Sequence, residues 1–204
     1  VVVIAAEGDI FCAGADLRRE ESESNVPKLE DSDDISLMLR HLYKPVICKI
    51  QGSVLAGALL MVTNSTHAVA VQEAKFSAPE ILRGLWPHMV MAGLFRVMPK
   101  RAGLDFVMRG QSIDAKQAKE WGLINEFVKA EELDDHVNKL SEELASLAPG
   151  TMSFGLEAYE KQDAMAFDEA LPFLQKQIAK TFEGPDAKEG IAAFLEKRKP
   201  NWDK

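Results

Sequence analysis

Three short segments decide the fold of this chain: Phe11-Cys12-Ala13-Gly14-Ala15-Asp16-Leu17, Gln51-Gly52-Ser53-Val54-Leu55-Ala56-Gly57 and Phe76-Ser77-Ala78-Pro79-Glu80. The first follows the apolar run at residues 1–6, and the second follows the apolar run at residues 45–50. Short continuous apolar runs are typical of buried β-strands, and segments of small residues are typical of turns. The sequence therefore predicts that each of the first two segments leaves the end of a buried strand.

The glycines of the first two segments, Gly14 and Gly57, indicate a particular chemistry. Glycine adopts backbone angles that other residues avoid, and it lets another group approach the main chain closely. The amide groups beside the two glycines can then face one pocket and bind an oxygen that gains negative charge during a reaction. The hypothesis is an oxyanion hole made by two separated turns.

The rest of the chain alternates between strand and helix patterns, which favours an α/β fold with repeated strand-strand-helix turns. The side chain of Asp114 is expected to cap a helix that starts there. Pro149-Gly150 is expected to end a separate helix at residues 133–147. We expect helices at residues 35–43, 58–63 and 133–147 and strands at residues 46–50 and 67–71.

Composition narrows the classes of partner. The chain has 204 residues and a formal net charge of -8, from 32 acidic and 24 basic residues. One hydrophobic core is the default for a chain of this length. Because no bulk positive field is present to hold a phosphate polymer, a nucleic acid is not expected as a partner.

Cysteine usage and hydropathy bear on the compartment. The two cysteines, Cys12 and Cys48, form neither a disulfide framework nor a metal-ligand pattern, which favours a reducing compartment and no metal site. The apolar runs are shorter than the roughly 20 residues that a membrane helix needs, and the first residues lack the basic region of a signal peptide. We expect a cytoplasmic protein without a membrane partner, or one of the mitochondrial matrix if the source is eukaryotic.

The three segments, in this order, resemble the crotonase family, also called the enoyl-CoA hydratase/isomerase family, whose members act on acyl-CoA thioesters. Two further matches, at residues 110–125 and 189–199, extend the likeness over nearly the whole chain. The resemblance implies a crotonase-like spiral of strand-strand-helix units, with an α/β core at residues 1–125 and a carboxy-terminal helical trimerisation region at residues 126–204. It also implies that the core lacks its usual amino-terminal part, and that the protein is a homotrimer or a dimer of trimers.

The resemblance assigns roles to residues of the three segments. The chemistry of the family places negative charge on the oxygen of a thioester. An enolate forms when a proton leaves the carbon beside the carbonyl, or when a nucleophile adds to a conjugated alkene. The two stabilising donors are then the backbone N–H groups of Ala15 and Gly57. Glu80 matches the family's catalytic glutamate, which moves a proton to or from carbon or water. No tightly bound cofactor is implied, because CoA enters as part of the substrate.

Leu60 departs from the family pattern. Counted without gaps from the second turn, it stands where well-known hydratases of the family carry their other glutamate. Leucine neither positions water nor exchanges a proton, so hydration by two glutamates is not available in its usual form. Hydration with Glu80 as the acid/base, and double-bond isomerisation by this single base, both remain open.

The segment after Glu80 departs as well, since His88 and two methionines replace the small residues of many relatives. Leu60 and His88 are candidate residues of the acyl pocket. Imidazole titrates near neutral pH, although a lone histidine near a helix start is more often structural. Met89 and Met91 are expected to pack into the core rather than to line an irregular apolar pocket.

The resemblance also implies a CoA site. It places CoA contacts at Ala13, Asp16 and Leu17, with Arg18 near a phosphate, and takes Phe194 and Lys197 from a neighbouring subunit. The acidic stretch at residues 18–34 is interpreted as a loop.

Two other classes of function stay open. The same oxyanion hole serves acyl transfer in an acyl-CoA hydrolase or a hydrolase of carbon-carbon bonds, although no convincing Ser-His-Asp set is present. A weakly active homologue that binds CoA thioesters is the other alternative, because of Leu60 and the abrupt start of the strand pattern.

Overall fold

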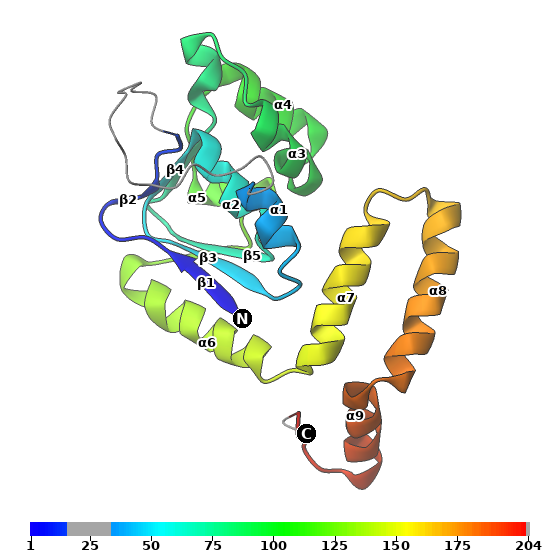
Figure 1. Ribbon diagram of the computed structural model, residues 1–204. Coiled ribbons are helices and arrows are strands. Elements are labelled where there is room, and N and C mark those ends of the chain that lie inside the picture. The colour runs from blue at the N-terminus through cyan, green and yellow to red at the C-terminus, as the bar shows by residue number, and fades with distance from the viewer. Residues whose placement is uncertain (16–33, 203–204) are drawn as a thin grey trace, which may run out of the picture.

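The computed structural model describes residues 1–15 and 34–202, and within these residues the chain forms two four-stranded sheets. The strand order is β1-β3-β5-β8 in the first sheet and β2-β4-β6-β7 in the second (Figure 1). The strands are β1 (Val2–Ala5), β2 (Ile10–Cys12), β3 (Val46–Ile50), β4 (Ser53–Leu55), β5 (His67–Val71), β6 (Lys75–Ser77), β7 (Ile113–Asp114) and β8 (Glu126–Val128).

Helices connect and cover these strands. The α-helices are α1 (Ile35–Arg40), α2 (Leu59–Asn64), α3 (His88–Val97), α4 (Lys100–Arg109), α5 (Ala115–Glu120), α6 (Leu133–Ala145), α7 (Pro149–Gln162), α8 (Phe167–Glu183) and α9 (Pro185–Glu196). Short 3-10 helices are η1 (Ala56–Ala58), η2 (Pro79–Arg83) and η3 (Ala130–Glu132).

The chain visits the two sheets in turn. β1, β3 and β5 of the first sheet are each followed by β2, β4 or β6 of the second. Helices α1 and α2 precede β3 and β5, and after β6 the chain adds β7 to the second sheet before β8 returns to the first. All pairs are parallel except β6 with β7. This arrangement confirms the predicted α/β spiral of strand-strand-helix units.

The second sheet brings the three segments quoted first to one place. Because β2, β4 and β6 are parallel neighbours, their carboxyl ends lie at the same edge, and residues 13–15, 56–57 and 78–80 follow those ends. Both glycine turns follow the strands of the apolar runs at residues 1–6 and 45–50, as predicted, but they do not follow them directly. A three-residue strand of the second sheet lies in between each time, too short for an alternating pattern to reveal it.

Burial in the core explains why the sequence predicted β3 and β5 correctly. Ile47, Cys48 and Ile50 of β3 and Ala70 of β5 have no exposed surface, and Val54 and Phe76 of the second sheet complete the same cluster. Helix α6 packs against β3 and β5. Strands buried in this way have no solvent face, so they read as continuous apolar runs.

Helix boundaries differ from the predicted ones at several ends. Helix α1 stops at Arg40, and α2 starts at Leu59 after the turn of η1. Asp114 caps α5 as predicted, since its carboxylate accepts the N–H of Gln117 at 2.8 Å. Pro149 begins α7 instead of ending α6, which stops at Ala145, because the first turn of a helix does not need the missing proline N–H.

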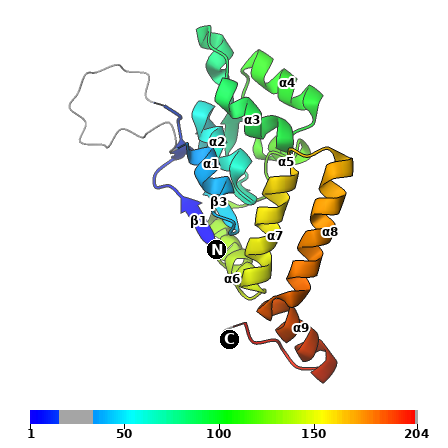
Figure 2. The same cartoon turned by 45° about the vertical axis from the view of Figure 1, so that its right-hand side comes forward.

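The last three helices extend away from the two sheets. Helix α8 runs beside α7, and α9 lies at the far end of this pair (Figures 1 and 2). The segment at residues 126–145 lies with the first sheet, since β8 pairs with β5 and α6 covers β3 and β5. The division into domains at residue 125 stays a prediction.

Candidate active site

The two glycine turns are in contact. Gly14 has a φ of +86°, and a Cβ atom placed on it would lie 3.0 Å from the backbone nitrogen of Gly57. A Cβ atom on Gly57 would lie 3.9 Å from the backbone nitrogen of Ala15. Ala56, which lies between the end of β4 and Gly57, also has a left-handed backbone, with a φ of 53°. The main-chain nitrogens of Ala15 and Gly57 are therefore close neighbours, although more than 40 positions separate them in the sequence.

Glu80 reaches the same edge from the third segment. Pro79 and Glu80 occupy the first turn of η2, directly after β6, so the helix-start pattern of Pro-Glu and the predicted site coincide. The Oε2 atom of Glu80 is buried and has no hydrogen-bond partner within the described residues. A buried, unpartnered carboxylate oxygen costs free energy of folding, and a catalytic role is one of the reasons for which proteins keep such a group.

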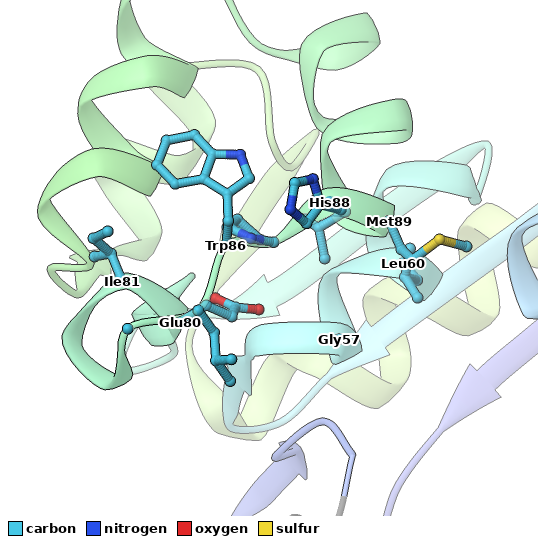
Figure 3. Close-up of a pocket in the computed structure, with 11 residues that line it drawn as sticks. Gly57, Leu60, Glu80, Ile81, Trp86, His88 and Met89 are labelled. Atoms are coloured by element: carbon cyan, nitrogen blue, oxygen red, sulfur yellow. The ribbon is translucent and has the colours of Figure 1, made fainter.

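A pocket of about 680 Å³ opens beside Glu80. Its lining includes Gly57, Leu60, Glu80, Trp86, His88 and Met89. Figure 3 shows the Glu80 carboxylate pointing into the pocket, toward the side on which Gly57 and His88 lie. The volume falls within the range of small-molecule sites, which hold a few polar groups in a mostly apolar wall.

The structure brings together most of the residues that the sequence singled out for the acyl pocket. Leu60, in the first turn of α2, is half-buried, and its position provides no carboxylate on that wall. His88 is the first residue of α3, and its backbone N–H donates to the carbonyl of Trp86 at 2.8 Å. Among the described residues, Glu80 and His88 are the titratable side chains in the lining.

The two methionines behave differently. Met89 is 62% exposed and lines the pocket, so the prediction that it packs into the core was wrong. Met91 is half-buried and accepts the indole N–H of Trp86 at its sulfur, 3.1 Å away. The two residues are neighbours on nearly opposite sides of α3, and sequence analysis had no partner element to decide which side faces the core.

Sequence analysis missed Ile81, Leu85 and Trp86 as lining residues. The signal available was their position, because all three lie in the segment that joins Glu80 to His88. A short connection between two residues of one pocket must itself pass along the wall of that pocket.

The family is identified by comparison with known proteins. The enoyl-CoA hydratase/isomerase family model matches residues 1–204. The chain belongs to this family of enzymes. A mevalonyl-coenzyme A hydratase of Aspergillus fumigatus is 30% identical over 216 residues, which cover 99% of this chain and 77% of that protein. The human enoyl-CoA hydratase domain-containing protein 3, mitochondrial, is 28% identical over 206 residues, which cover 99% of this chain and 68% of that protein.

Solved structures agree with this assignment. A crystal structure of an enoyl-CoA hydratase of Mycobacterium smegmatis superimposes with a TM-score of 0.90 at 29% identity, covering 100% of this chain and 80% of that one. The structure of human enoyl-CoA hydratase domain-containing protein 3 gives a TM-score of 0.86 at 27% identity, with 98% and 81% covered. This member of the enoyl-CoA hydratase/isomerase family therefore has the crotonase fold.

The CoA contacts that the family resemblance implied stay predictions. Ala13 is exposed directly after β2, whereas Asp16, Leu17 and Arg18 lie outside the described residues, as does the acidic stretch up to residue 33. Phe194, at the end of α9, is 82% exposed, and Lys197 follows that helix; neither lines the pocket of Glu80.

Other candidate chemistries find no support in the described residues. Burial raises the pKa of the Cys48 thiol to about 11, so Cys48 is a neutral thiol at physiological pH. No group of three or more His, Cys, Asp or Glu residues in the described part of the chain is arranged to hold a metal ion. Within residues 1–15 and 34–202, no helix is both long and apolar enough to cross a membrane.

Proposed function

We propose that this protein processes acyl-CoA thioesters by stabilising a thioester enolate, with Glu80 as the acid/base. The observation that carries the proposal is the buried, unpartnered Oε2 atom of Glu80, which lines one pocket with Gly57. A carboxylate held without a partner beside an apolar pocket is suited to exchange a proton with a bound substrate.

The two glycine turns support the electrostatic half of the proposal. We assign the oxyanion hole to the backbone N–H groups of Ala15 and Gly57, whose nitrogens are neighbours across the contact of the two turns. Fixed amide donors stabilise charge that develops on the thioester oxygen, and loss of one such donor typically costs about 2.7–4 kcal/mol of transition-state stabilisation. This arrangement needs no tightly bound cofactor, because CoA is part of the substrate.

Two reactions follow from an enolate in this pocket. Addition of water to a 2-enoyl thioester passes through the enolate and needs a group that activates water. Migration of a double bond needs one base that removes a proton from one carbon and returns it to another. Among the described residues that line the pocket, Glu80 is the one with a carboxylate, because Leu60 stands where a second carboxylate would be. Counted by carboxylates, the pocket therefore favours migration of a double bond, which needs one base.

The site is completed by another subunit in this proposal. Helix α8 exposes the apolar residues Phe167, Leu171, Ile178 and Phe182, spaced along one face of the helix. A stripe of this kind is suited to an interface, and we assign it to a homotrimer or a dimer of trimers. Phe194 and Lys197 would then reach CoA from the neighbouring subunit. We place the protein in the cytoplasm or the mitochondrial matrix; the human relative is named as mitochondrial.

The test is Glu80→Gln with a panel of 2-enoyl-, 3-enoyl- and saturated acyl-CoA thioesters. Glutamine keeps the size of the side chain but cannot act as a base, so turnover should fall by about 10²-fold or more while thioester binding stays within twofold. Product formation is followed by mass spectrometry, and binding by calorimetry.

Glu131→Gln is the matched control, because Glu131 is exposed on η3 outside the pocket. It should retain wild-type turnover. Equal activity of Glu80→Gln and wild type would reject the assignment of Glu80 as the acid/base.

A further inference from the structure

The pocket holds a second group that exchanges protons. Glu80 stands on the η2 wall, and His88 stands on the α3 wall of the same pocket (Figure 3). We propose that His88 is the second proton-transfer residue, and that the pocket therefore hydrates 2-enoyl-CoA thioesters. This inference rests on the proposed function, and it decides between the two reactions left open there.

The connection between the two residues fixes their relation. The backbone N–H of Leu85 donates to the carbonyl of Glu80 at 3.0 Å, and that of His88 donates to the carbonyl of Trp86 at 2.8 Å. The indole N–H of Trp86 donates to the sulfur of Met91 at 3.1 Å, which fastens the connection to α3. Glu80 and His88 are thus joined by a connection of seven residues, and the packing of η2 on α4 and of α3 on α2 supports the two ends of that connection.

The imidazole of His88 is free for chemistry. His88 is exposed to the pocket, and its ring makes no hydrogen bond or ion pair within the described residues. A structural histidine normally uses its ring nitrogens to bind another protein group. The nearby charged residue Arg83 of η2 instead donates to the carbonyl of Pro79, 3.4 Å away, and is not part of the lining.

Two proton-transfer groups match the atom balance of hydration. The oxygen of water bonds to C3 of the enoyl group while the carboxylate of Glu80 takes a proton from that water. The electron pair of the C2–C3 double bond moves to the thioester oxygen, which gives the enolate. C2 then takes a proton from the imidazolium of His88. Glu80 returns its proton to solvent and His88 regains one, so the net change is the addition of one water molecule.

The other side chains of the lining cannot supply the second proton. Leu60 and Met89 carry no exchangeable proton, and the indole N–H of Trp86 does not titrate and is bonded to Met91. With Leu60 in place of a carboxylate, the imidazole of His88 is the titratable group besides Glu80 among the described lining residues.

The first arm of the experiment compares wild type with His88→Gln in the hydration of 2-butenoyl-CoA. Glutamine retains hydrogen bonding but does not titrate, so we expect kcat to fall by about 10²-fold. His136→Gln is the matched control, because His136 lies on α6 outside the pocket, and it should behave as wild type.

The second arm separates a catalytic role from a structural one. His88→Ala removes the ring. Free imidazole added to the assay should raise the rate of His88→Ala at least tenfold over its rate without imidazole. Added imidazole should not restore Glu80→Gln, whose missing group is a carboxylate.

The two arms also separate this inference from the proposed function. If Glu80→Gln is inactive while His88→Gln keeps the wild-type rate, the role of His88 is rejected and that of Glu80 stands. If Glu80→Gln is fully active, the proposed function is rejected. Loss of activity in His88→Ala without rescue by imidazole would reduce His88 to a packing residue and overturn the inference.

Discussion

At the scale of single residues, Gly14 holds the contact between the two turns. Its φ of +86° is a left-handed value, and its missing Cβ leaves room for the backbone nitrogen of Gly57 at 3.0 Å. In Gly14→Ala, the left-handed backbone costs about 1–2 kcal/mol of folding free energy. The added methyl group also pushes the second turn away, so turnover should fall by more than the stability loss explains. Urea unfolding and kcat/KM measure the two effects.

Gly8→Ala is the control for backbone strain alone. Gly8 has a φ of +81°, and a Cβ atom there meets nothing within 4 Å. The Gly8→Ala variant should lose about as much stability as Gly14→Ala and should keep the wild-type kcat/KM. Equal activity losses in Gly8→Ala and Gly14→Ala would contradict a role for the contact between the turns.

Leu60 is the residue that separates this pocket from a two-glutamate hydratase. A carboxylate placed there faces the same pocket as Glu80, so Leu60→Glu should raise hydration relative to isomerisation. Leu60→Gln adds the same polar bulk without a base and should not change the ratio. The ratio of 3-hydroxyacyl to 3-enoyl products, measured by chromatography, decides. A less stable Leu60→Glu protein with an unchanged ratio would count against this view of the position.

At the scale of elements, the packing of α3 on α2 sets where the pocket wall stands. A Cβ atom on Gly93 of α3 would lie 2.3 Å from the Oγ1 atom of Thr63 of α2, so only glycine fits without movement. Thr63 is itself fixed, since its hydroxyl donates to the carbonyl of Leu59 at 2.8 Å. Gly93→Ala should therefore destabilise the protein by about 1–3 kcal/mol through overpacking. Because α3 begins at His88, the KM for the thioester should rise as well.

Two further variants test this explanation. Thr63→Ala combined with Gly93→Ala removes the clashing hydroxyl and should recover part of the loss, which a double-mutant cycle measures. Gly155 of α7 meets nothing within 4 Å, so Gly155→Ala should stabilise the helix by about 0.5–1 kcal/mol. If Gly155→Ala is destabilised, helix propensity does not explain how the free energy of unfolding changes when a helix glycine is replaced by alanine.

Elements differed in how well the sequence predicted them, for physical reasons. β3 and β5 were predicted at their observed bounds because burial makes them continuous apolar runs. β2 and β4 were missed because strands of three residues carry no detectable period. The pairing of these strands with β6 brings the two turns and Glu80 to one edge. The glycines suggested that the two turns share a pocket, but Glu80 could be added to it only through the family resemblance. Long-range parallel pairing leaves no local pattern in the chain.

At the scale of the whole molecule, a cluster of ion pairs fastens the last helices to the α/β part. Arg40 of α1 contacts Glu160 of α7 at 2.7 Å and Asp163, the C-cap of α7, at 3.0 Å. Arg96 of α3 reaches the same Asp163 carboxylate at 2.7 Å. One carboxylate thus joins α7 to two helices, one of which carries His88.

The Asp163 carboxylate makes this junction sensitive to acid. The hydrogen bond from Arg96, followed by the one from Arg40, lowers the pKa of Asp163 below its ordinary value. A carboxyl group with a lowered folded-state pKa stabilises the fold above its unfolded pKa, and the contribution disappears as the pH falls through the folded-state pKa. Asp163→Asn should therefore lose about 1–3 kcal/mol at neutral pH, because charged hydrogen bonds are lost.

The difference between Asp163→Asn and wild type should begin to shrink below about pH 4, the ordinary pKa of an aspartate, and should be lost as the pH falls through the lower folded-state pKa of Asp163. Urea unfolding of both proteins at neutral and acid pH measures it. Asp105→Asn is the control, since Asp105 forms an exposed pair with Arg109 at 3.3 Å on one helix. Such pairs contribute at most about 1 kcal/mol, so this variant should change little at either pH. A loss in Asp163→Asn that is the same at neutral and acid pH would mean that the charge of Asp163 does not hold α7 in place.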